Sequence, residues 1–343
     1  MTKKYFKLFA NCIGVLGYKK AIICDLQRHK AHIITHSIYN LVEKCKKLNI
    51  DSVIDSIEYE RDDVLLNLDK LVELELGFWT ENPQNFPEIN LDWESPELIN
   101  NAIIEIDLNS LIDIESFLDD IFSLKCKFLE IREYASFSEE KLYFILNKCS
   151  VSQIRSINLF VKFINDEMIE KLNKLLINFP KLSNVVIHSC NDLDIFPGNT
   201  KILKTKQIIN NNSHCGNVGK QYFRNNIKFF TEAQSYNTCL NKKISLVNNG
   251  IIKNCPSMKK SFGKVNEIKL KELIINNEFK GVWNISKDKV KVCRDCEYRY
   301  ICTDCRAFRD DESDIFSRPS KCKYNPYIGK WEGEKGYVSV LDV

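Results

Sequence analysis

Four of the fourteen cysteines in this 343-residue chain fall within thirteen residues, as Cys293, Cys296, Cys302 and Cys305. A CxxC pair folds into a tight turn that directs two thiolates at one metal, and two such pairs follow each other here. Four more cysteines lie around them, namely Cys215, Cys239, Cys255 and Cys322. Eight cysteines make two complete sets of four ligands, and the same region has little helix or strand periodicity. The sequence therefore predicts a segment that metal binding holds in shape.

The spacing of the pairs bears on which metal binds. Zinc ribbons separate their two CxxC pairs by about 15–20 residues, whereas five residues separate Cys296 from Cys302. In iron–sulfur proteins, adjacent pairs send ligands to different clusters. Spacing thus favours iron–sulfur clusters, with structural zinc and free thiols as the alternatives.

The remaining six cysteines are scattered singly, and single cysteines usually behave as small buried apolar side chains; they are Cys12, Cys24, Cys45, Cys126, Cys149 and Cys190. No apolar run reaches the roughly 18 residues of a membrane span. We expect no signal peptide, because Asn11 interrupts the short apolar stretch that follows Lys3 and Lys4. Many thiols without a secretory signal fit a reducing, cytoplasmic compartment.

The net charge of +3 gives little support to nucleic-acid binding. The basic segments have no arginine-rich or aromatic-interleaved stripe, so neither nucleic acid nor a membrane is expected as a partner. Residues 51–120 hold twenty acidic and two basic residues, between more basic ends. Such an asymmetry can steer a charged peptide, although solvated helix faces explain it equally well.

The N-terminal segment predicts a small sheet followed by three helices. The expected strands are Tyr5–Cys12, Ala21–Leu26 and Ala31–Thr35, and the expected helices are Ser37–Lys47, Ser52–Glu58 and 62–76. Val64, Leu68 and Leu71 fall on one face of the third helix, and Gly77 suits its C-terminal cap. A proline-containing stretch with Pro83, Pro87 and Pro96 follows as a linker.

Strand-like runs then begin near residues 102, 128, 155 and 183, with helical patterns between them and a fifth short run at Lys201–Leu203. Alternation of strands and helices at this spacing predicts right-handed βαβ units and a parallel sheet. Four or five strands make half a barrel or a small open sheet, not a complete eightfold barrel.

The cysteine-rich region resembles the SPASM domain, the auxiliary-cluster module of radical-SAM peptide-modifying enzymes. The shared elements are Cys239–x10–Gly250–x4–Cys255, then Cys293–x2–Cys296–x5–Cys302, and finally Cys322. The sequence departs from the family pattern at Cys302–x2–Cys305, where the family has one residue more. This resemblance implies two [4Fe–4S] clusters, with Zn as the alternative metal. It assigns Cys239, Cys255 and Cys305 to the first cluster and Cys293, Cys296, Cys302 and Cys322 to the second. Cys215 is the candidate for the fourth ligand of the first cluster, although it lies farther upstream than the extra ligand of the family.

The CxxxCxxC triplet that binds the S-adenosylmethionine cluster in radical-SAM enzymes does not occur in the chain. Radical-SAM catalysis is therefore not expected, catalytic residues stay unknown, and whether the protein is an enzyme is left open. The sequence looks like a SPASM protein whose βα region is shortened.

The N-terminal segment is similar to the PqqD-like winged helix that recognises precursor peptides. Such modules add a leader peptide as an extra strand at a sheet edge, beside the third helix. The resemblance implies contacts to a peptide from Ala31, Ile33, Val64, Leu68 and Leu71. A plain α+β domain without a peptide partner is the alternative.

The predicted fold class is α+β in three parts. These are a winged-helix-like peptide-recognition segment (1–82), a partial (β/α) barrel-like sheet (98–210) and a SPASM-like cysteine-rich module (211–343). Together they resemble the maturases of grasp-with-spasm systems. That resemblance implies an accessory maturase of ribosomally synthesised, post-translationally modified peptides, acting with a precursor peptide and an ATP-grasp ligase. A zinc-stapled peptide-binding adaptor and a cluster-based redox enzyme without S-adenosylmethionine chemistry are the alternatives.

Overall fold

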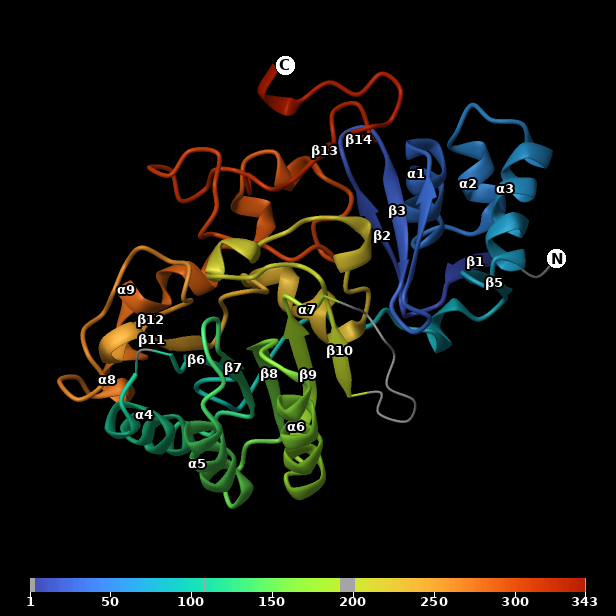
Figure 1. Cartoon of the computed structure of the whole chain (residues 1–343). Helices are drawn as coiled ribbons and strands as arrows, with labels where there is room; N and C mark the ends of the chain where they lie inside the picture. Colours follow the sequence, from blue (N-terminus) through green and yellow to red (C-terminus); the bar gives the residue numbers. More distant parts are fainter. Residues whose placement is uncertain (1–3, 108, 192–200, 343) are drawn as a thin grey trace.

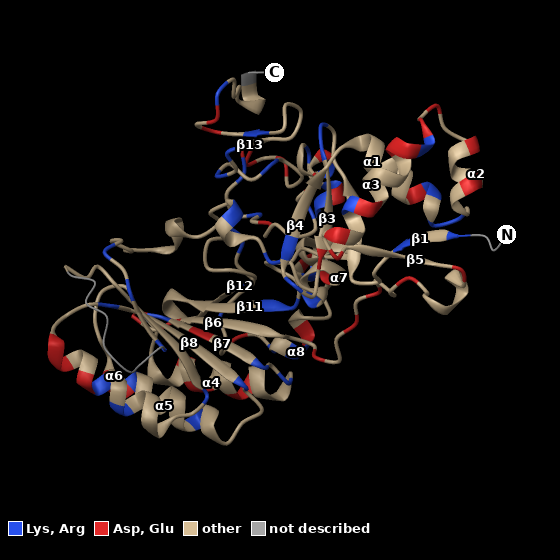
Figure 2. Cartoon of the chain, turned by 90° about the vertical axis from the view of Figure 1, so that its right-hand side faces the viewer, with Lys and Arg blue, Asp and Glu red and all other residues tan. Residues whose placement is uncertain are grey.

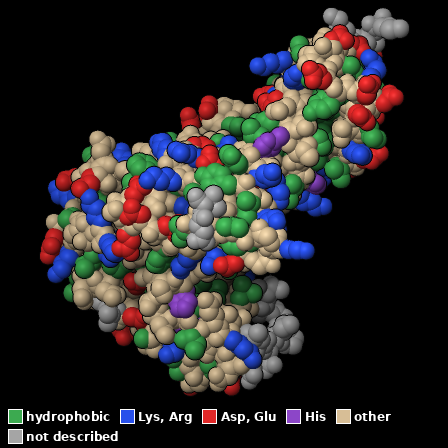
Figure 3. All heavy atoms as spheres, turned by 90° about the horizontal axis from the view of Figure 1, so that it is seen from above, with side chains coloured by type: hydrophobic (Ala, Val, Ile, Leu, Met, Phe, Trp, Pro, Cys, Tyr) green, Lys and Arg blue, Asp and Glu red, His purple; other side chains and the backbone are tan. Residues whose placement is uncertain are grey.

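The computed structural model describes residues 4–107, 109–191 and 201–342. It is a mixed α+β structure with an N-terminal group of strands and helices, a central sheet, and a C-terminal region of loops and short helices (Figure 1). Seen from above, a narrow lobe projects from a broader one, and acidic, basic and apolar side chains are mixed over this face (Figure 3). None of the helices in the described ranges is long and apolar enough to cross a membrane.

Two small antiparallel sheets begin the chain. One pairs β1 (Tyr5–Leu8) with β5 (Gly77–Thr80). The other has the order β2-β3-β4 and consists of β2 (Cys12–Leu16), β3 (Ala21–Asp25) and β4 (Lys30–Ile34). The single strand predicted at Tyr5–Cys12 is wrong, because a turn after Leu8 ends β1 and β2 starts at Cys12 in a different sheet.

Three helices cover these sheets: α1 (His36–Cys45), α2 (Ile50–Asp55) and α3 (Arg61–Glu73). Thr35 and Asn49 cap the first two, since their side chains accept hydrogen bonds from Ile38 N and Ser52 N. The helix cap predicted at Gly77 is wrong. Gly77 opens β5, and the left-handed residue after α3 is Glu75, with φ 55°.

The central sheet has seven strands in the order β10-β9-β8-β7-β6-β11-β12. The expected parallel strands are present as β6 (Asn101–Glu105), β7 (Phe128–Arg132), β8 (Ser156–Lys162), β9 (Leu182–His188) and β10 (Ile202–Lys204). The helices between them are α4 (Leu111–Ser123), α5 (Glu139–Ser150) and α6 (Asp166–Asn178). The predicted βαβ rhythm is thus confirmed.

Helices α4 to α6 cover one face of this sheet (Figure 1). Alternate strand residues such as Leu129, Ile131 and Leu159 belong to the core beneath those helices. Glu130 and Arg132 alternate with them along β7 and so point to the other face. Charged residues of both signs lie along α5 and α6 (Figure 2). The opposite face carries polar side chains and lies across a cavity from Lys228 and Glu232. Parallel sheets are normally buried on both sides, mostly by apolar residues.

Sequence periodicity did not reveal the elements after residue 210. These are α7 (Ile227–Ser235), β11 (Lys243–Val247), β12 (Ile251–Lys253), α8 (Leu270–Leu273), α9 (Asn277–Lys280), β13 (Tyr324–Asn325) and β14 (Lys330–Trp331). Strand β11 joins the central sheet parallel to β6, and β12 follows it antiparallel. The cysteine-rich region is therefore continuous with the sheet.

The N-terminal sheet also packs on the cysteine-rich region. Tyr18 N donates to Asp295 O at 2.7 Å, and Arg299 donates to Leu16 O at 2.6 Å. Between these contacts, a Cβ on Gly17 would lie 2.6 Å from the backbone nitrogen of Glu297. Only glycine allows the two backbones to approach this closely.

Candidate metal centres

The four cysteines assigned to the second cluster line one cavity. Cys293 and Cys296 flank a short 3-10 turn, Cys302 follows the next turn of the chain, and Cys322 arrives just before β13. Aromatic side chains line the same cavity, including Phe223, Tyr298, Tyr324 and Trp331. Cys293 and Cys322, which are nearly thirty positions apart in the sequence, thus line the same apolar cavity.

This cavity disfavours bare thiolates. Burial raises the pKa of Cys293 to about 12 and holds that of Cys296 well above its usual range. Burial likewise raises the pKa of Cys322. Lys287 lines the same cavity, and its ammonium donates to Cys302 Sγ at 3.0 Å. Since metal binding requires deprotonated thiols, a bound cation would have to supply most of the charge compensation here.

The cysteines assigned to the first cluster are also brought together. Burial raises the pKa of Cys255 to about 12 and raises that of Cys305, and in both cases the nearby Cys239 thiolate adds to the rise. Beside Cys215, Gly216 has φ +80°, and a Cβ there would lie 3.0 Å from Cys305 Sγ. The chain at Cys215 therefore passes directly against Cys305.

The four cysteines of the second set line one cavity, and Cys239 of the first set lines a neighbouring one. Within the described ranges, no three His, Cys, Asp or Glu side chains lie close enough to hold a single metal ion. A metal group held by all four thiols of the second set would have to lie in the cavity that they share. The donor set is all sulfur, as both iron–sulfur clusters and structural zinc accept.

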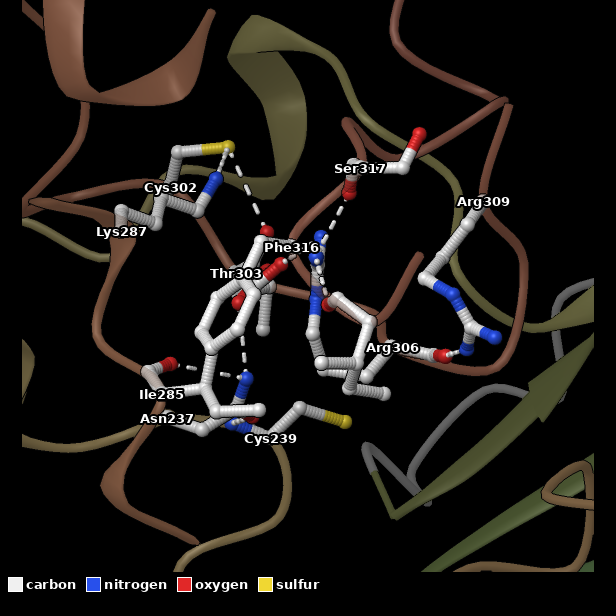
Figure 4. Close-up of polar contacts among 12 residues, drawn as sticks. Asn237, Cys239, Ile285, Lys287, Cys302, Thr303, Arg306, Arg309, Phe316 and Ser317 are labelled. Atoms are coloured by element: carbon white, nitrogen blue, oxygen red, sulfur yellow. Dashed lines mark hydrogen bonds and ion pairs between the residues drawn. The ribbon is translucent and has the colours of Figure 1, made fainter. Parts of the chain in front are cut away.

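A buried polar network lies between the two sets (Figure 4). Asn237 Nδ2 donates to Asp304 Oδ2 at 2.7 Å, while Asn237 Oδ1 accepts from the backbone nitrogen of Cys239 at 3.1 Å. Asp304 pairs with Arg306 at 2.7 Å. Because Asp304 and Arg306 flank Cys305, this network fixes two cysteines of the first set, Cys239 and Cys305, against the segment that carries the second set.

Some of these residues could be foreseen and others could not. Arginines among the cysteines are visible in the sequence, but their spacing does not predict that Arg306 is fully buried. No sequence motif or spacing pointed to Asn237, Lys243 or Lys287. Their functions depend on contacts across the fold and not on local spacing.

A cavity of about 430 Å³ adjoins the first set. It lies between the polar face of the central sheet and the segment around α7, with Glu130 on one side and Lys228 on the other. Cys239 and Lys243 line it as well. A molecule bound in this cavity would therefore reach the first set of thiols from the sheet side.

The residues predicted to touch a peptide divide into two groups. Ala31 and Ile33 lie on β4, which is an edge strand, and Ile33 is 56% exposed. Val64 lines a cavity between α1 and α3 that begins next to the end of β4. Leu68 and Leu71 lie in the core of the N-terminal region, out of contact with solvent.

The six scattered cysteines are buried in apolar cores, as expected.

No family model matches the sequence, and no curated protein is similar to it in sequence. Among solved structures, the chain is similar to SuiB of Streptococcus suis bound to S-adenosylmethionine, with 11% identity and a TM-score of 0.35, over 92% of this chain and 99% of that chain. It is also similar to SuiB bound to precursor peptide SuiA, with 10% identity and a TM-score of 0.33, over 93% and 100% of the two chains.

Proposed function

We propose that the protein is an accessory maturase for ribosomally synthesised, post-translationally modified peptides. It binds a precursor peptide through its N-terminal segment, carries two auxiliary [4Fe–4S] clusters and acts beside an ATP-grasp ligase. The observation that carries this proposal is the cavity that Cys293, Cys296, Cys302 and Cys322 line together. The SPASM-like spacing of the cysteines supplies the link from that cavity to peptide maturation.

The second site would be held by those four cysteines, and the first by Cys215, Cys239, Cys255 and Cys305. A bound cluster supplies one-electron transfer or structural support. The residues of this chain exclude water with an aromatic wall, place Lys287 against one thiol and anchor Cys239 through Asn237. Zinc at the same thiols would instead make the protein a non-redox, peptide-binding adaptor.

The metal identity is the first test. Protein purified without oxygen is expected to contain about eight irons and eight acid-labile sulfides per chain, with broad visible absorbance around 400 nm. Metal analysis, sulfide analysis and the visible spectrum measure this directly. About two zincs per chain and no colour would overturn the cluster proposal and leave the adaptor function.

The peptide site is proposed at the outer edge of β4. Among the described strands, β4 pairs with β3 alone, so its other edge is open for an added strand. Ile33 presents an exposed apolar side chain there, and the cavity lined by Ile38, Tyr59 and Val64 can receive a side chain of the added strand. At one end of this edge, Asn225 Nδ2 donates to Lys30 O.

Ile33→Asp is expected to weaken binding of the precursor peptide at least tenfold, because a carboxylate would replace the apolar contact at the sheet edge. The probe is a fluorescein-labelled synthetic copy of the precursor peptide encoded beside this gene, and the readout is fluorescence anisotropy. Ile112→Asp is the matched control, since Ile112 is 73% exposed on α4. Equal affinity for both variants would place the peptide elsewhere, and no binding to the unmodified protein would refute peptide recognition.

A further inference from the structure

Each of the two cysteine sets has one lysine directed at a thiol. The Lys287 ammonium lies 3.0 Å from Cys302 Sγ in the second set, and Figure 4 shows the two side chains in contact. In the first set, Lys243 Nζ lies 3.7 Å from Cys239 Sγ. The two lysines come from unrelated elements, a 3-10 turn before the CxxC pairs and strand β11.

Lys287 is buried, so its charge needs a partner inside the protein. Its exposed fraction is 6%, whereas lysine is almost never buried without a partner for its charge. No carboxylate within the described ranges forms an ion pair with it. Asp304, which lies in the same region, is engaged by Arg306 at 2.7 Å and by Asn237.

The same pattern holds at the first site. Lys243 is partly buried beside the central cavity, and it forms no ion pair with a carboxylate of the described residues. Glu130 lies across that cavity, but it pairs with Arg132 at 2.5 Å. At each site, therefore, the neighbouring carboxylate already has its own cation, and the lysine is directed at sulfur.

A buried ammonium needs a negative charge close by, since removing one member of a buried charge pair leaves the other uncompensated. Four thiolates around a metal centre provide that charge, because their combined negative charge exceeds what the metal group neutralises. We propose that Lys287 and Lys243 are the counter-cations of the two metal–thiolate sites, each donating to one ligand sulfur. This inference rests on the proposed function, because it requires metal at both sets of thiols.

The counter-cation has two consequences. It stabilises the loaded site by offsetting the negative charge that burial makes unfavourable. In an iron–sulfur cluster it also raises the reduction potential, because net charge and hydrogen bonds to sulfur set that potential. Lys287 should have the larger effect, since it is nearer to its sulfur and more deeply buried.

The test compares Lys287→Met, Lys287→Arg and Lys289→Met in protein loaded with its native metal. Methionine keeps an unbranched side chain one atom shorter than lysine and removes the charge, whereas arginine keeps the charge. Lys289 is the control because it is exposed and donates to the backbone oxygen of Asn284. The readouts are the rate of metal transfer to a chelator and, where iron is bound, the potential from a redox titration followed by electron paramagnetic resonance.

Lys287→Met is expected to release metal from one site at least tenfold faster than Lys287→Arg or Lys289→Met. For an iron–sulfur cluster, the ratio of reduced to oxidised centre at a fixed potential should fall about tenfold, which is about 59 mV for one electron. Lys243→Met should act in the same direction on the other site. Unchanged release and potential in Lys287→Met would overturn this inference alone, whereas an unmodified protein that binds no metal would overturn the proposed function as well.

Discussion

Changing Cys293 and Cys296 to serine together is expected to empty the second site and leave the first one loaded. Iron should fall from about eight to about four atoms per chain, or zinc from about two to one. The reason is spatial: these two thiols line a cavity with Cys302 and Cys322, and no first-set cysteine lines it. Metal and sulfide analysis of the purified variant measures the change.

The reciprocal variant, Cys239→Ser with Cys255→Ser, should lose the other half of the metal. Cys45→Ser is the control, because Cys45 is a buried cysteine of the N-terminal core, remote from both sets. Loss of all metal in either double variant would show that the eight thiols form one interdependent centre. Full metal content in both double variants would show that these four cysteines are not metal ligands.

The second large effect concerns the buried pair of Asp304 and Arg306. Arg306→Met is expected to destabilise the loaded protein by about 3–5 kcal/mol, since it leaves Asp304 as a buried charge without its cation. Arg306 is fully buried and also donates to the backbone oxygens of Ile315 and Ser317, so the loop that follows Cys305 loses its anchor too. Urea unfolding of the metal-loaded variant gives the change in free energy.

Two further variants test whether the loss of charge pairing causes this destabilisation. Arg294→Met removes an arginine whose side chain is 61% exposed, and its effect should stay within about 0.5 kcal/mol. Adding Asp304→Asn to Arg306→Met should recover part of the loss, because no unpaired charge then remains. If the single and double variants were equally unstable, packing of the arginine and not charge pairing would be its main contribution.

The parts of the fold that the sequence predicted are those with strong local periodicity. The helices α4 to α6 and the strands between them repeat an apolar pattern that encodes both their type and their parallel arrangement. The turn between β1 and β2 was missed, because apolar residues continue almost without a break through it. Strand β11 was missed for another reason: its place beside β6 is set by tertiary pairing and not by a neighbouring βα repeat.

The candidate metal ligands could be predicted from the sequence because ligand spacing is a local property. Their separation into two sets came from a resemblance, and the structure brings the four members of the second set to one cavity. The charged groups around them could not be foreseen. Lys287 precedes Cys302 by fifteen positions, and Asn237 reaches Asp304 across sixty-seven. Contacts over such separations depend on the path of the whole chain.

The apolar cluster between the N-terminal sheet and the cysteine-rich region has a consequence for how the two ends of the protein communicate. Val15 and Ile22 of that sheet belong to the same cluster as Tyr298 and Cys302, and Cys296 and Cys322 pack against it. Movement of the sheet would therefore disturb the packing around these thiols. If metal binds there as proposed and the two events are coupled through this cluster, reciprocity requires that a ligand of the sheet and the metal change each other's affinity by the same factor.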